Sequence, residues 1–153
     1  MTGRARVPAR AFWFDAPAQR IRFAHDLREL EALTIPRRTR YPGGFDVAVT
    51  LRLPDMPPRR VTIAFHRATP ASPRVFADGP TDSPHRYGDG SLCMWHPDDP
   101  EDRRWVPQQG AAALVAEIAA HLIREEWWRR TGEWAGDEVT HTPFRPTNES
   151  APR

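Results

Sequence analysis

The stretch FDVAVTLRLPDMPPRRVTIAFHR, residues 45–67, contains two segments in which apolar and polar side chains alternate. Successive side chains of a β-strand point to opposite faces of the sheet, so this period of two predicts strands with one buried face. The proline-rich segment between them predicts a turn. We therefore expect an antiparallel hairpin whose buried face carries Phe45, Val47, Val49, Leu51, Leu53, Val61, Ile63 and Phe65.

Helical patterns flank this hairpin on both sides. Residues 14–33 carry apolar side chains at three- and four-residue spacing, and we expect Asp15 to cap this helix and Pro17 to lie in its first turn. Residues 108–134 predict a longer helix that Gly132 ends. The apolar positions of the two helices are Phe23, Leu27, Leu30, Leu33, Leu114, Ile118 and Leu122.

Together the patterns predict an α+β domain. It would have an N-terminal helix, an antiparallel meander of three to four strands, a long loop and a long C-terminal helix. The third strand is expected as a short one over residues 72–79, and Asp46 is expected on the polar face of the sheet. The length of 153 residues suits one domain, over residues 1–141, and the polar residues 142–153 are predicted to form a mobile tail.

All 22 basic residues of the chain are arginine, and none is lysine. Codon usage in a GC-rich genome is the simplest explanation, since Ala and Pro are also abundant. The arginines are interleaved with Asp and Glu, so we expect no nucleic-acid partner. No stretch reaches the roughly 18 apolar residues of a membrane span, and the basic N-terminus lacks a secretory signal. With its single free thiol, the protein is expected to be cytoplasmic.

That thiol belongs to Cys93, in the stretch HRYGDGSLCMW of residues 85–95. It lies in the middle of a loop expected from Gly79 to Gln109, and a loop of this length is unusual in a compact domain unless it has a function. A lone cysteine is most often a small buried apolar residue. The Gly-Asp-Gly turn and the histidines and aspartates around it leave two further interpretations open, a metal ligand and a nucleophile.

Two common cysteine chemistries find little support in this loop. A single cysteine forms no internal disulfide and cannot supply a zinc site of two or four cysteines, so only a site of one cysteine and several histidines is left. A cysteine protease needs a Cys–His pair oriented by Asn or Asp, and residues of these types are present. The usual signatures around a protease nucleophile are absent.

The order of the motifs around Cys93 resembles the ubiquitin-conjugating enzyme (UBC) superfamily. Those enzymes run from a strand through His-Pro-Asn and Gly-x-Ile/Leu-Cys to Trp-x-Pro and a helix. Here Ser83-Pro84-His85 falls on the first motif, and Gly90-Ser91-Leu92-Cys93 matches the second. Trp105-Val106-Pro107 matches the third, displaced by a longer insert. The fold that this resemblance implies is UBC-like.

The resemblance covers about residues 15–125 and extends upstream of the cysteine. Residues 61–76 resemble the family's strand, proline-rich turn and Pro-x-Val-x-Phe strand, although Val75 and Phe76 are adjacent here. Residues 85–141 are most similar to stand-alone bacterial members found beside CBASS-type antiphage defence genes. This similarity implies a role in conjugating a partner, such as a CBASS nucleotidyltransferase or a ubiquitin-like protein, through its C-terminus.

For the residues of this chain, the resemblance implies that Cys93 carries the partner's acyl group as a thioester and passes it to an amine. His85 stands in the family's asparagine slot, where it could donate to the oxyanion, act as a base or simply pin the loop. Asp98 or Asp99 could orient the amine, and an exposed acidic loop explains them equally well. His96 is expected in the solvent. Trp95 and Trp105 are expected to pack the loop against the sheet.

No cofactor is expected, and no Gly-rich or Walker-type nucleotide motif occurs. A separate activating enzyme would load Cys93, or the partner's C-terminus would be attacked directly. The absence of lysine would then spare the carrier from modifying itself. A non-catalytic binding module on the same fold is the alternative, because the asparagine is missing.

Overall fold

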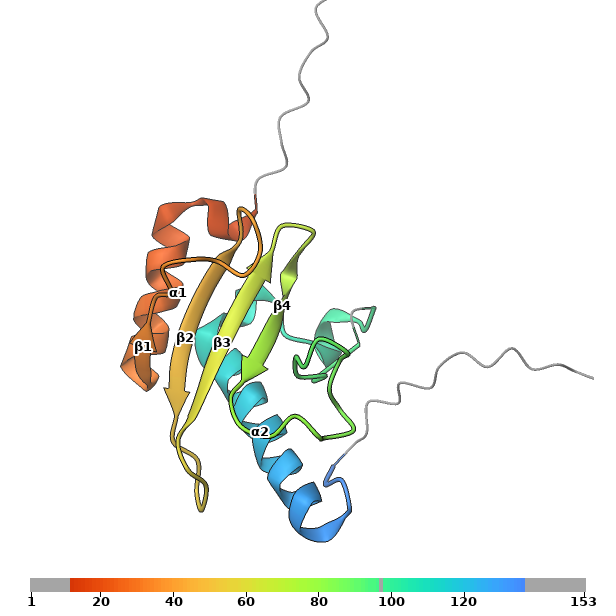
Figure 1. The fold of residues 1–153 in the computed structure, drawn as a ribbon. Helices are drawn as coiled ribbons and strands as arrows, with labels where there is room; N and C mark the ends of the chain where they lie inside the picture. The colour runs from red at the N-terminus through yellow and green to blue at the C-terminus, as the bar shows by residue number, and fades with distance from the viewer. Residues whose placement is uncertain (1–11, 97, 137–153) are drawn as a thin grey trace, which may run out of the picture.

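The computed structural model describes residues 12–96 and 98–136. Two helices and a four-stranded sheet make up most of this part of the chain (Figure 1). No helix within it is long and apolar enough to cross a membrane. The elements, in order, are η1 (Trp13–Asp15), α1 (Pro17–Leu30), β1 (Ala32–Thr34), β2 (Phe45–Leu51), β3 (Arg59–His66), β4 (Thr69–Ala77), η2 (Glu101–Arg103), η3 (Pro107–Gln109) and α2 (Gly110–Thr131).

The sheet is an antiparallel meander in the order β1-β2-β3-β4. The hairpin predicted from residues 45–67 is confirmed, with Val47 opposite Ile63 and Val49 opposite Val61. The turn between its strands places Asp55 at a φ of 58°, a conformation that Asp tolerates better than most residues. The α+β prediction is therefore confirmed.

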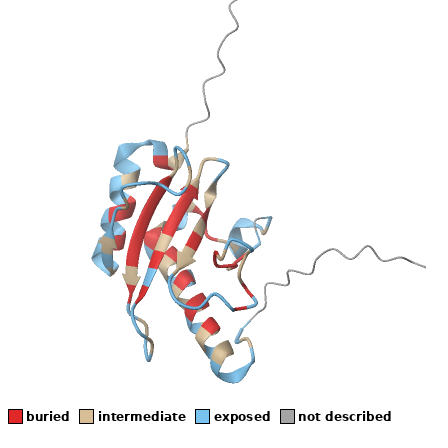
Figure 2. Cartoon of the chain, in the orientation of Figure 1, coloured by how far each residue is buried: buried red, intermediate tan, exposed pale blue. Residues whose placement is uncertain are grey.

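The core lies between one face of the sheet and the two helices. Figure 2 shows the central strands and the inner side of α2 as buried. Phe65 is at the centre of an aromatic cluster, with its ring centroid 5.6 Å from that of Phe23 and 5.9 Å from that of Trp105. Trp105 comes from the long loop, is 1% exposed and donates its indole N–H to the Gly110 carbonyl at 2.8 Å. This side chain anchors the end of the loop in the core.

The first helix is shorter than predicted, and two of its expected features are wrong. Asp15 does not cap α1, because its carboxylate accepts from the Phe12 backbone N–H at 2.9 Å and pairs with Arg67 at 2.7 Å. Leu30 is 47% exposed instead of buried. Pro17 opens the helix as expected, and Phe23 and Leu27 are buried. Leu33 lies beyond the helix, in β1.

The sheet also departs from the prediction at its edges. β1 has only three residues and was not predicted, because so short a strand shows no periodicity. β4 covers nine residues, Thr69–Ala77, instead of the short strand over 72–79. Asp46 is 5% exposed, so the face of the sheet away from the helices is not uniformly polar and open. Its Oδ2 accepts from the Arg40 backbone N–H at 3.0 Å, because the chain between β1 and β2 covers it.

The second helix matches its prediction closely. Leu114, Ile118 and Leu122 are fully buried along one stripe, and Gly132 ends the helix in the left-handed conformation at a φ of 77°. The chain then continues to Gly136. The predicted tail, residues 142–153, lies outside the described residues, and the boundary at residue 141 stays a prediction.

Candidate active site

Residues 85–93 form a tight hairpin that carries Cys93 at its end. The Cys93 N–H donates to the His85 carbonyl at 2.9 Å, and the Tyr87 N–H donates to the Ser91 carbonyl at 2.9 Å. Gly90 closes the turn at a φ of 85°, where a side chain would be strained. The Gly-Asp-Gly sequence therefore folds this part of the loop back on itself.

Three hydrogen bonds fasten the hairpin and stiffen its turn. The Leu92 N–H donates to the Val75 carbonyl at 2.8 Å, which fastens the returning arm of the hairpin to β4, the edge strand of the sheet. Asp89 Oδ1 accepts from the Ser91 N–H at 2.9 Å and from its hydroxyl at 2.6 Å. The position of Cys93 is thus set by its own backbone hydrogen bond to His85 and by that of the preceding residue to β4.

Cys93 is buried, at 3% exposure. Burial raises the pKa of its thiol above the ordinary value, and two neighbours oppose this effect without cancelling it. They are the nearby Tyr87 hydroxyl and the positive charge of Arg74. In this conformation the neutral thiol is therefore favoured at neutral pH.

Tyr87 links Cys93 to the rest of the loop. Its hydroxyl donates to the Trp95 carbonyl at 3.0 Å, and the Arg74 guanidinium carbon lies 4.6 Å from the centre of its ring. Burial raises the pKa of Tyr87, and the adjacent Cys93 raises it further. The phenol therefore stays protonated and able to donate.

A small hollow of about 50 Å³ lies beside this group, between β4 and the loop. It is too small to enclose more than a fragment of a ligand, because sites for drug-sized molecules have volumes of several hundred Å³. Its lining residues include Ser72, Arg74, Tyr87, Met94 and Trp95.

His85 lies directly opposite Cys93 in the hairpin and is 9% exposed. Its ring centroid lies 4.2 Å from that of Trp134, which follows the end of α2, and the Trp134 ring also contacts His121 at 5.3 Å. Its backbone N–H donates to Ser83 Oγ at 3.2 Å. The structure thus places His85 next to Cys93 across the hairpin. Ser83, which stands in the family's histidine position, holds the His85 backbone.

A buried ion-pair network fixes the other face of the hairpin to α2. Arg86 donates to both carboxylate oxygens of Glu125, at 2.6 and 2.9 Å, and to the Gly90 carbonyl at 2.8 Å. The Arg86 and Glu125 side chains are 4% and 0% exposed. Burial acts to raise the pKa of Glu125, but the nearby His121 imidazole and the hydrogen bonds from Arg86 prevail and lower it to about 2.

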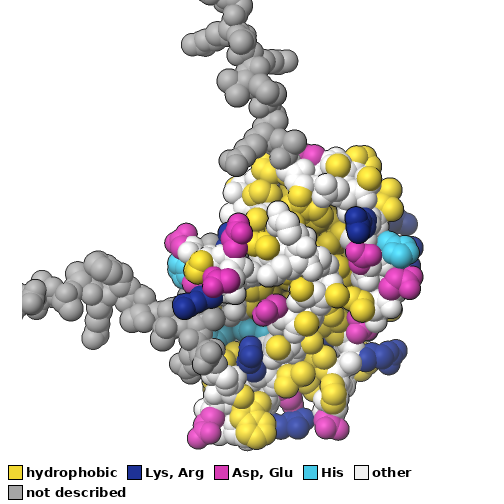
Figure 3. Space-filling view, turned by 180° about the vertical axis from the view of Figure 1, so that it is seen from behind, with side chains coloured by type: hydrophobic (Ala, Val, Ile, Leu, Met, Phe, Trp, Pro, Cys, Tyr) yellow, Lys and Arg dark blue, Asp and Glu magenta, His cyan; other side chains and the backbone are white. Residues whose placement is uncertain are grey.

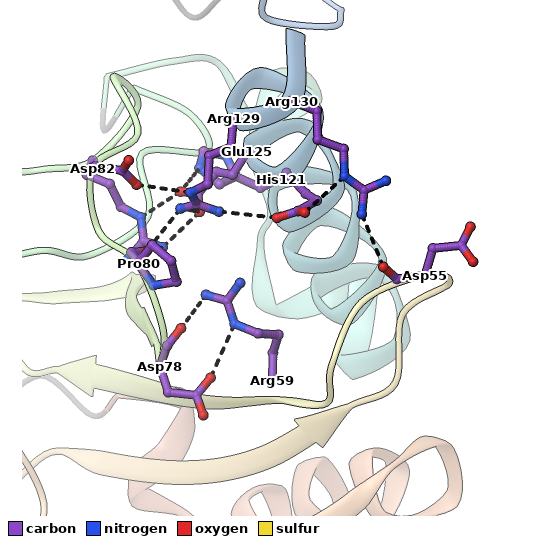
Figure 4. A network of polar contacts seen from close by, with 11 residues as sticks. Asp55, Arg59, Asp78, Pro80, Asp82, His121, Glu125, Arg129 and Arg130 are labelled. Atoms are coloured by element: carbon purple, nitrogen blue, oxygen red, sulfur yellow. Dashed lines mark hydrogen bonds and ion pairs between the residues drawn. The ribbon is translucent and has the colours of Figure 1, made fainter. Parts of the chain in front are cut away.

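The same carboxylate binds a second arginine at the end of α2. Figure 4 shows Glu125 beside His121 and Arg129, with Arg129 reaching Asp82 and Pro80 at the start of the loop. The Arg129–Glu125 distance is 3.3 Å and the His121–Glu125 distance is 3.4 Å. Through Arg86 and Arg129, Glu125 therefore connects both ends of residues 80–90 to the helix.

The two candidate aspartates have different positions. The Asp98 side chain is 92% exposed, and its backbone N–H donates to His96 Nδ1 at 3.1 Å. Asp99 is half-buried, accepts from the His96 N–H at 2.9 Å and lies near enough to Tyr87 for its charge to raise the pKa of the phenol. His96 is partly exposed, as expected. The structure brings Asp99 toward the site and leaves Asp98 at the surface.

The tryptophans of the loop are placed as predicted, packed against the sheet and its core. Trp95 is 5% exposed and Trp105 is 1% exposed. At the end of α2, Trp127 is 50% exposed and Trp128 is half-buried. Figure 3, seen from behind, shows hydrophobic side chains over much of this face, with charged side chains between and around them.

Three residues that define this site, namely Tyr87, Arg74 and Glu125, are not among the candidates predicted from the sequence. A signal for Tyr87 was present: in a hairpin with a turn at residues 88–90, Tyr87 and Cys93 lie on opposite arms as diagonal neighbours on the same face. No local sequence pattern indicated the Arg86–Glu125 pair, because its partners are 39 residues apart. In the part of the chain that the structure describes, no group of three or more His, Cys, Asp or Glu side chains is placed to hold a metal ion.

One comparison with known proteins gives a match. The sequence model of a family described as Type II CBASS E2 protein matches residues 27–142, a segment that includes the hairpin, Cys93 and Glu125. No curated protein and no solved structure matches the chain. The N-terminal helix, four-stranded meander, long loop and long second helix form the α+β arrangement of a UBC-like fold.

Proposed function

Since the chain belongs to the family of type II CBASS E2 proteins, we propose that it is an acyl carrier that uses Cys93 in antiphage defence. Cys93 is the one thiol of the chain, and the hairpin of residues 85–93 holds it between the sheet and α2. Its position at the end of a rigid hairpin, within a segment that the family covers, is the observation that carries the proposal.

Two transfers make up the proposed reaction. In the first, the Cys93 thiolate attacks the carbonyl carbon of a partner's C-terminal residue that a separate activating enzyme holds as a thioester. A new C–S bond forms, and the sulfur of the activating enzyme leaves with its electron pair. In the second, an amine attacks the same carbon, the C–N bond forms, and the Cys93 sulfur leaves as thiolate. The amine loses its proton to a base or to water.

The burial of Cys93 sets a condition on this chemistry. A thiol that is 3% exposed with a raised pKa is a weak nucleophile. Docking of the loaded partner must therefore open access to the sulfur and favour its ionisation. Such a requirement also protects the thiol from reacting when no partner is bound.

His85 is proposed to act near the reacting carbonyl. It is the direct neighbour of Cys93 across the hairpin, where a side chain N–H could donate to the oxyanion of the tetrahedral intermediate. The contact of its ring with Trp134 equally supports a role in pinning the loop. Asp99 is proposed to help orient the amine, and its proximity to Tyr87 favours it over Asp98.

The partner is proposed to be a CBASS protein, either a nucleotidyltransferase or a ubiquitin-like protein that offers its C-terminus. The reducing cytoplasm would keep the thiol free for this reaction. The absence of lysine removes every side-chain amine that the carrier could modify on itself. If unrelated proteins of the same genome also lack lysine, this last interpretation is wrong and codon usage explains the composition.

A non-catalytic binding module is the second candidate, and the burial and raised pKa of Cys93 favour it. Co-expression of the chain with its genomic neighbours separates the two. We expect an adduct on a non-reducing gel that disappears with thiol reagents and that Cys93→Ala abolishes. If Cys93→Ala leaves both the adduct and the downstream conjugation intact, the protein is a binding module.

A further inference from the structure

Arg74 of β4 lies over the face of the hairpin that carries Cys93. Its guanidinium carbon is 4.6 Å from the centre of the Tyr87 ring, and its Nη1 approaches Ser91 Oγ at 3.5 Å. Tyr87 and Ser91 are paired across the hairpin, and the next pair is His85 with Cys93. Paired residues project to one face, and residues two apart along a strand share that face. The arginine is therefore one step along the ladder from the cysteine.

The positive charge of Arg74 is not paired with a carboxylate. Within residues 12–96 and 98–136, its side chain forms no ion pair, and its one hydrogen bond, to Ser91, is longer than an ordinary one. Asp89, in the adjacent turn, bonds to Ser91 instead. Arg86 differs from Arg74, because both oxygens of Glu125 bind it. Arg74 thus brings an uncompensated charge to this side of the hairpin.

The donors of Arg74 also face open space. A guanidinium has five N–H donors in one plane, and stacking on a ring engages its face and leaves these donors free. Arg74 is half-buried and is the one charged residue lining the hollow of about 50 Å³ between β4 and the loop. About 10–15 Å³ of such space holds a water molecule, so the hollow admits a group of a few atoms. Charged or strongly polarised oxygens are the groups that a guanidinium binds best.

The charge of Arg74 acts at the position of the sulfur. Burial raises the pKa of the Cys93 thiol, and the charge of Arg74 is one of the two influences that oppose this rise. An oxygen on a carbon bonded to that sulfur would lie in the same electrostatic field. In both transfers of the proposed reaction, such an oxygen gains negative charge when the carbonyl carbon becomes tetrahedral.

Resting on the acyl-carrier function proposed above, we propose that Arg74 is a catalytic residue that binds the acyl oxygen of the group on Cys93 and stabilises its oxyanion. When a nucleophile attacks the carbonyl carbon, the π electron pair of the C=O bond moves to oxygen, and the guanidinium N–H groups donate to it. When the leaving sulfur departs with its electron pair, the C=O bond forms again. Arg74 transfers no proton, because the guanidinium stays protonated. An oxyanion site holds more than one donor, so this role is compatible with that of His85.

Alkylation of the free protein with reagents of different charge tests where Arg74 acts. Cys93 is the one thiol of the chain, so intact mass follows its reaction with anionic iodoacetate and with neutral iodoacetamide. We expect Arg74→Met to lower the ratio of the iodoacetate rate to the iodoacetamide rate by about fivefold, which corresponds to about 1 kcal/mol. Arg74→Lys keeps the charge and should keep the ratio. Arg22→Met removes a charge from an exposed position on α1, at the opposite edge of the sheet (Figure 1), and should also keep it.

An unchanged ratio in Arg74→Met with a wild-type circular-dichroism spectrum would overturn the proposal. The wild type itself serves if this variant fails to fold. Raising the salt from about 0.01 M to about 1 M shortens the Debye length from about 30 Å to about 3 Å. The wild-type ratio should then fall toward that of a small thiol such as glutathione. A ratio that does not change with salt contradicts the proposed charge at the thiol.

Single-turnover discharge of the loaded carrier onto an amine tests the catalytic step. Arg74→Met should slow it by about a hundredfold, the order that loss of one oxyanion donor gives. Arg74→Lys should recover part of this loss, because an ammonium donates to the oxygen without the fork of a guanidinium. A rate equal to that of Arg22→Met would overturn the role of Arg74.

The two measurements separate failure of this proposal from failure of the proposed function. If a thiol-labile adduct forms on Cys93 and Arg74→Met discharges it at the wild-type rate, the role of Arg74 is wrong and the acyl carrier stands. If the alkylation ratio falls but no adduct forms, the carrier function is wrong and the oxyanion role fails with it, while the charge of Arg74 still acts on the thiol.

Discussion

The hairpin of residues 85–93 and the segment of residues 96–103 belong to the same loop but are held in different ways. The hairpin is bonded to β4 through Leu92 and to α2 through the buried Arg86–Glu125 pair. In the second segment, the contacts of Asp98 and Asp99 are made mainly with near neighbours such as His96. Polar residues equally close to Cys93 in sequence therefore differ in how firmly they are positioned, and only a firmly positioned group can act on a reacting atom.

The largest effect is expected where the hairpin meets α2. Arg86→Met leaves the Glu125 carboxylate buried without its bidentate partner, which should lower the free energy of unfolding by about 3–5 kcal/mol. Chemical denaturation measures it. Arg130→Met is the control, because Arg130 is 57% exposed in its ion pair with Glu126 and should cost less than about 1 kcal/mol.

A rescue variant sharpens this first prediction. Arg86→Met combined with Glu125→Leu removes both charges, so much of the lost stability should return. Equal stability of Arg86→Met and the wild type would show that the network does not hold the hairpin, and the contrast between the two regions would be lost.

The second effect is a loss of stability in acid. The pKa of Glu125 is lowered to about 2 in the folded protein, below its ordinary value of 4.5. A lowered pKa contributes stability that is fully present above the unfolded value and is lost as the pH falls from 4.5 through 2. The difference of about 2.5 pKa units corresponds to about 3 kcal/mol.

Denaturation at a series of pH values checks this window. The stability difference between the wild type and Glu125→Gln should shrink as the pH falls from 4.5 toward 2. A difference that stays constant over this range would mean that Glu125 is not held as a carboxylate by the hairpin and α2.

A smaller effect, on rate instead of stability, is expected at His85. If His85 acts on the oxyanion or on the incoming amine, His85→Ala slows amine transfer by more than about tenfold while the protein stays folded. Single-turnover discharge of the loaded carrier onto an amine measures it. His25→Ala, at an exposed position on α1, is the matched control. A rate equal to that of the control would limit His85 to pinning the loop against Trp134.

The smallest effect is expected at Asp98. Its side chain is 92% exposed, so Asp98→Asn should change stability by less than about 0.5 kcal/mol and leave the discharge rate unchanged. Asp99→Asn, beside Tyr87, should change the rate more than Asp98→Asn does. The reverse order would show that the exposed segment, once a partner binds, is as well positioned as the hairpin.

Local sequence patterns predicted the strands and helices of this molecule better than the contacts of its candidate active site. The alternation in β2 and β3 and the stripe of α2 report burial directly, because side-chain periodicity and buried faces coincide. Asp15 was placed wrongly because its carboxylate has a distant alternative partner, Arg67. The site depends on similar contacts, since Glu125 is 39 residues from Arg86 and no local pattern encodes that distance.

Within the loop, the motif order located Cys93 and His85, and the structure added what surrounds them. Tyr87 could have been inferred from the Gly-Asp-Gly turn, since the turn fixes which residues face each other. Arg74 could not, because its contact with Tyr87 depends on how β4 lies beside the hairpin. The burial of Cys93 agrees with the general expectation for a lone cysteine, which the irregular loop alone could not decide.

The central claim is that Cys93 carries an acyl group, and trapping that group tests it most directly. Cys93→Ser should replace the thioester with an oxyester when the chain is co-expressed with its genomic neighbours. We predict that intact-mass measurement finds the same partner on both proteins, released by thiols from the wild type but only by mild base from Cys93→Ser. An adduct that survives thiol treatment on the wild type, or no adduct on either protein, would contradict the account.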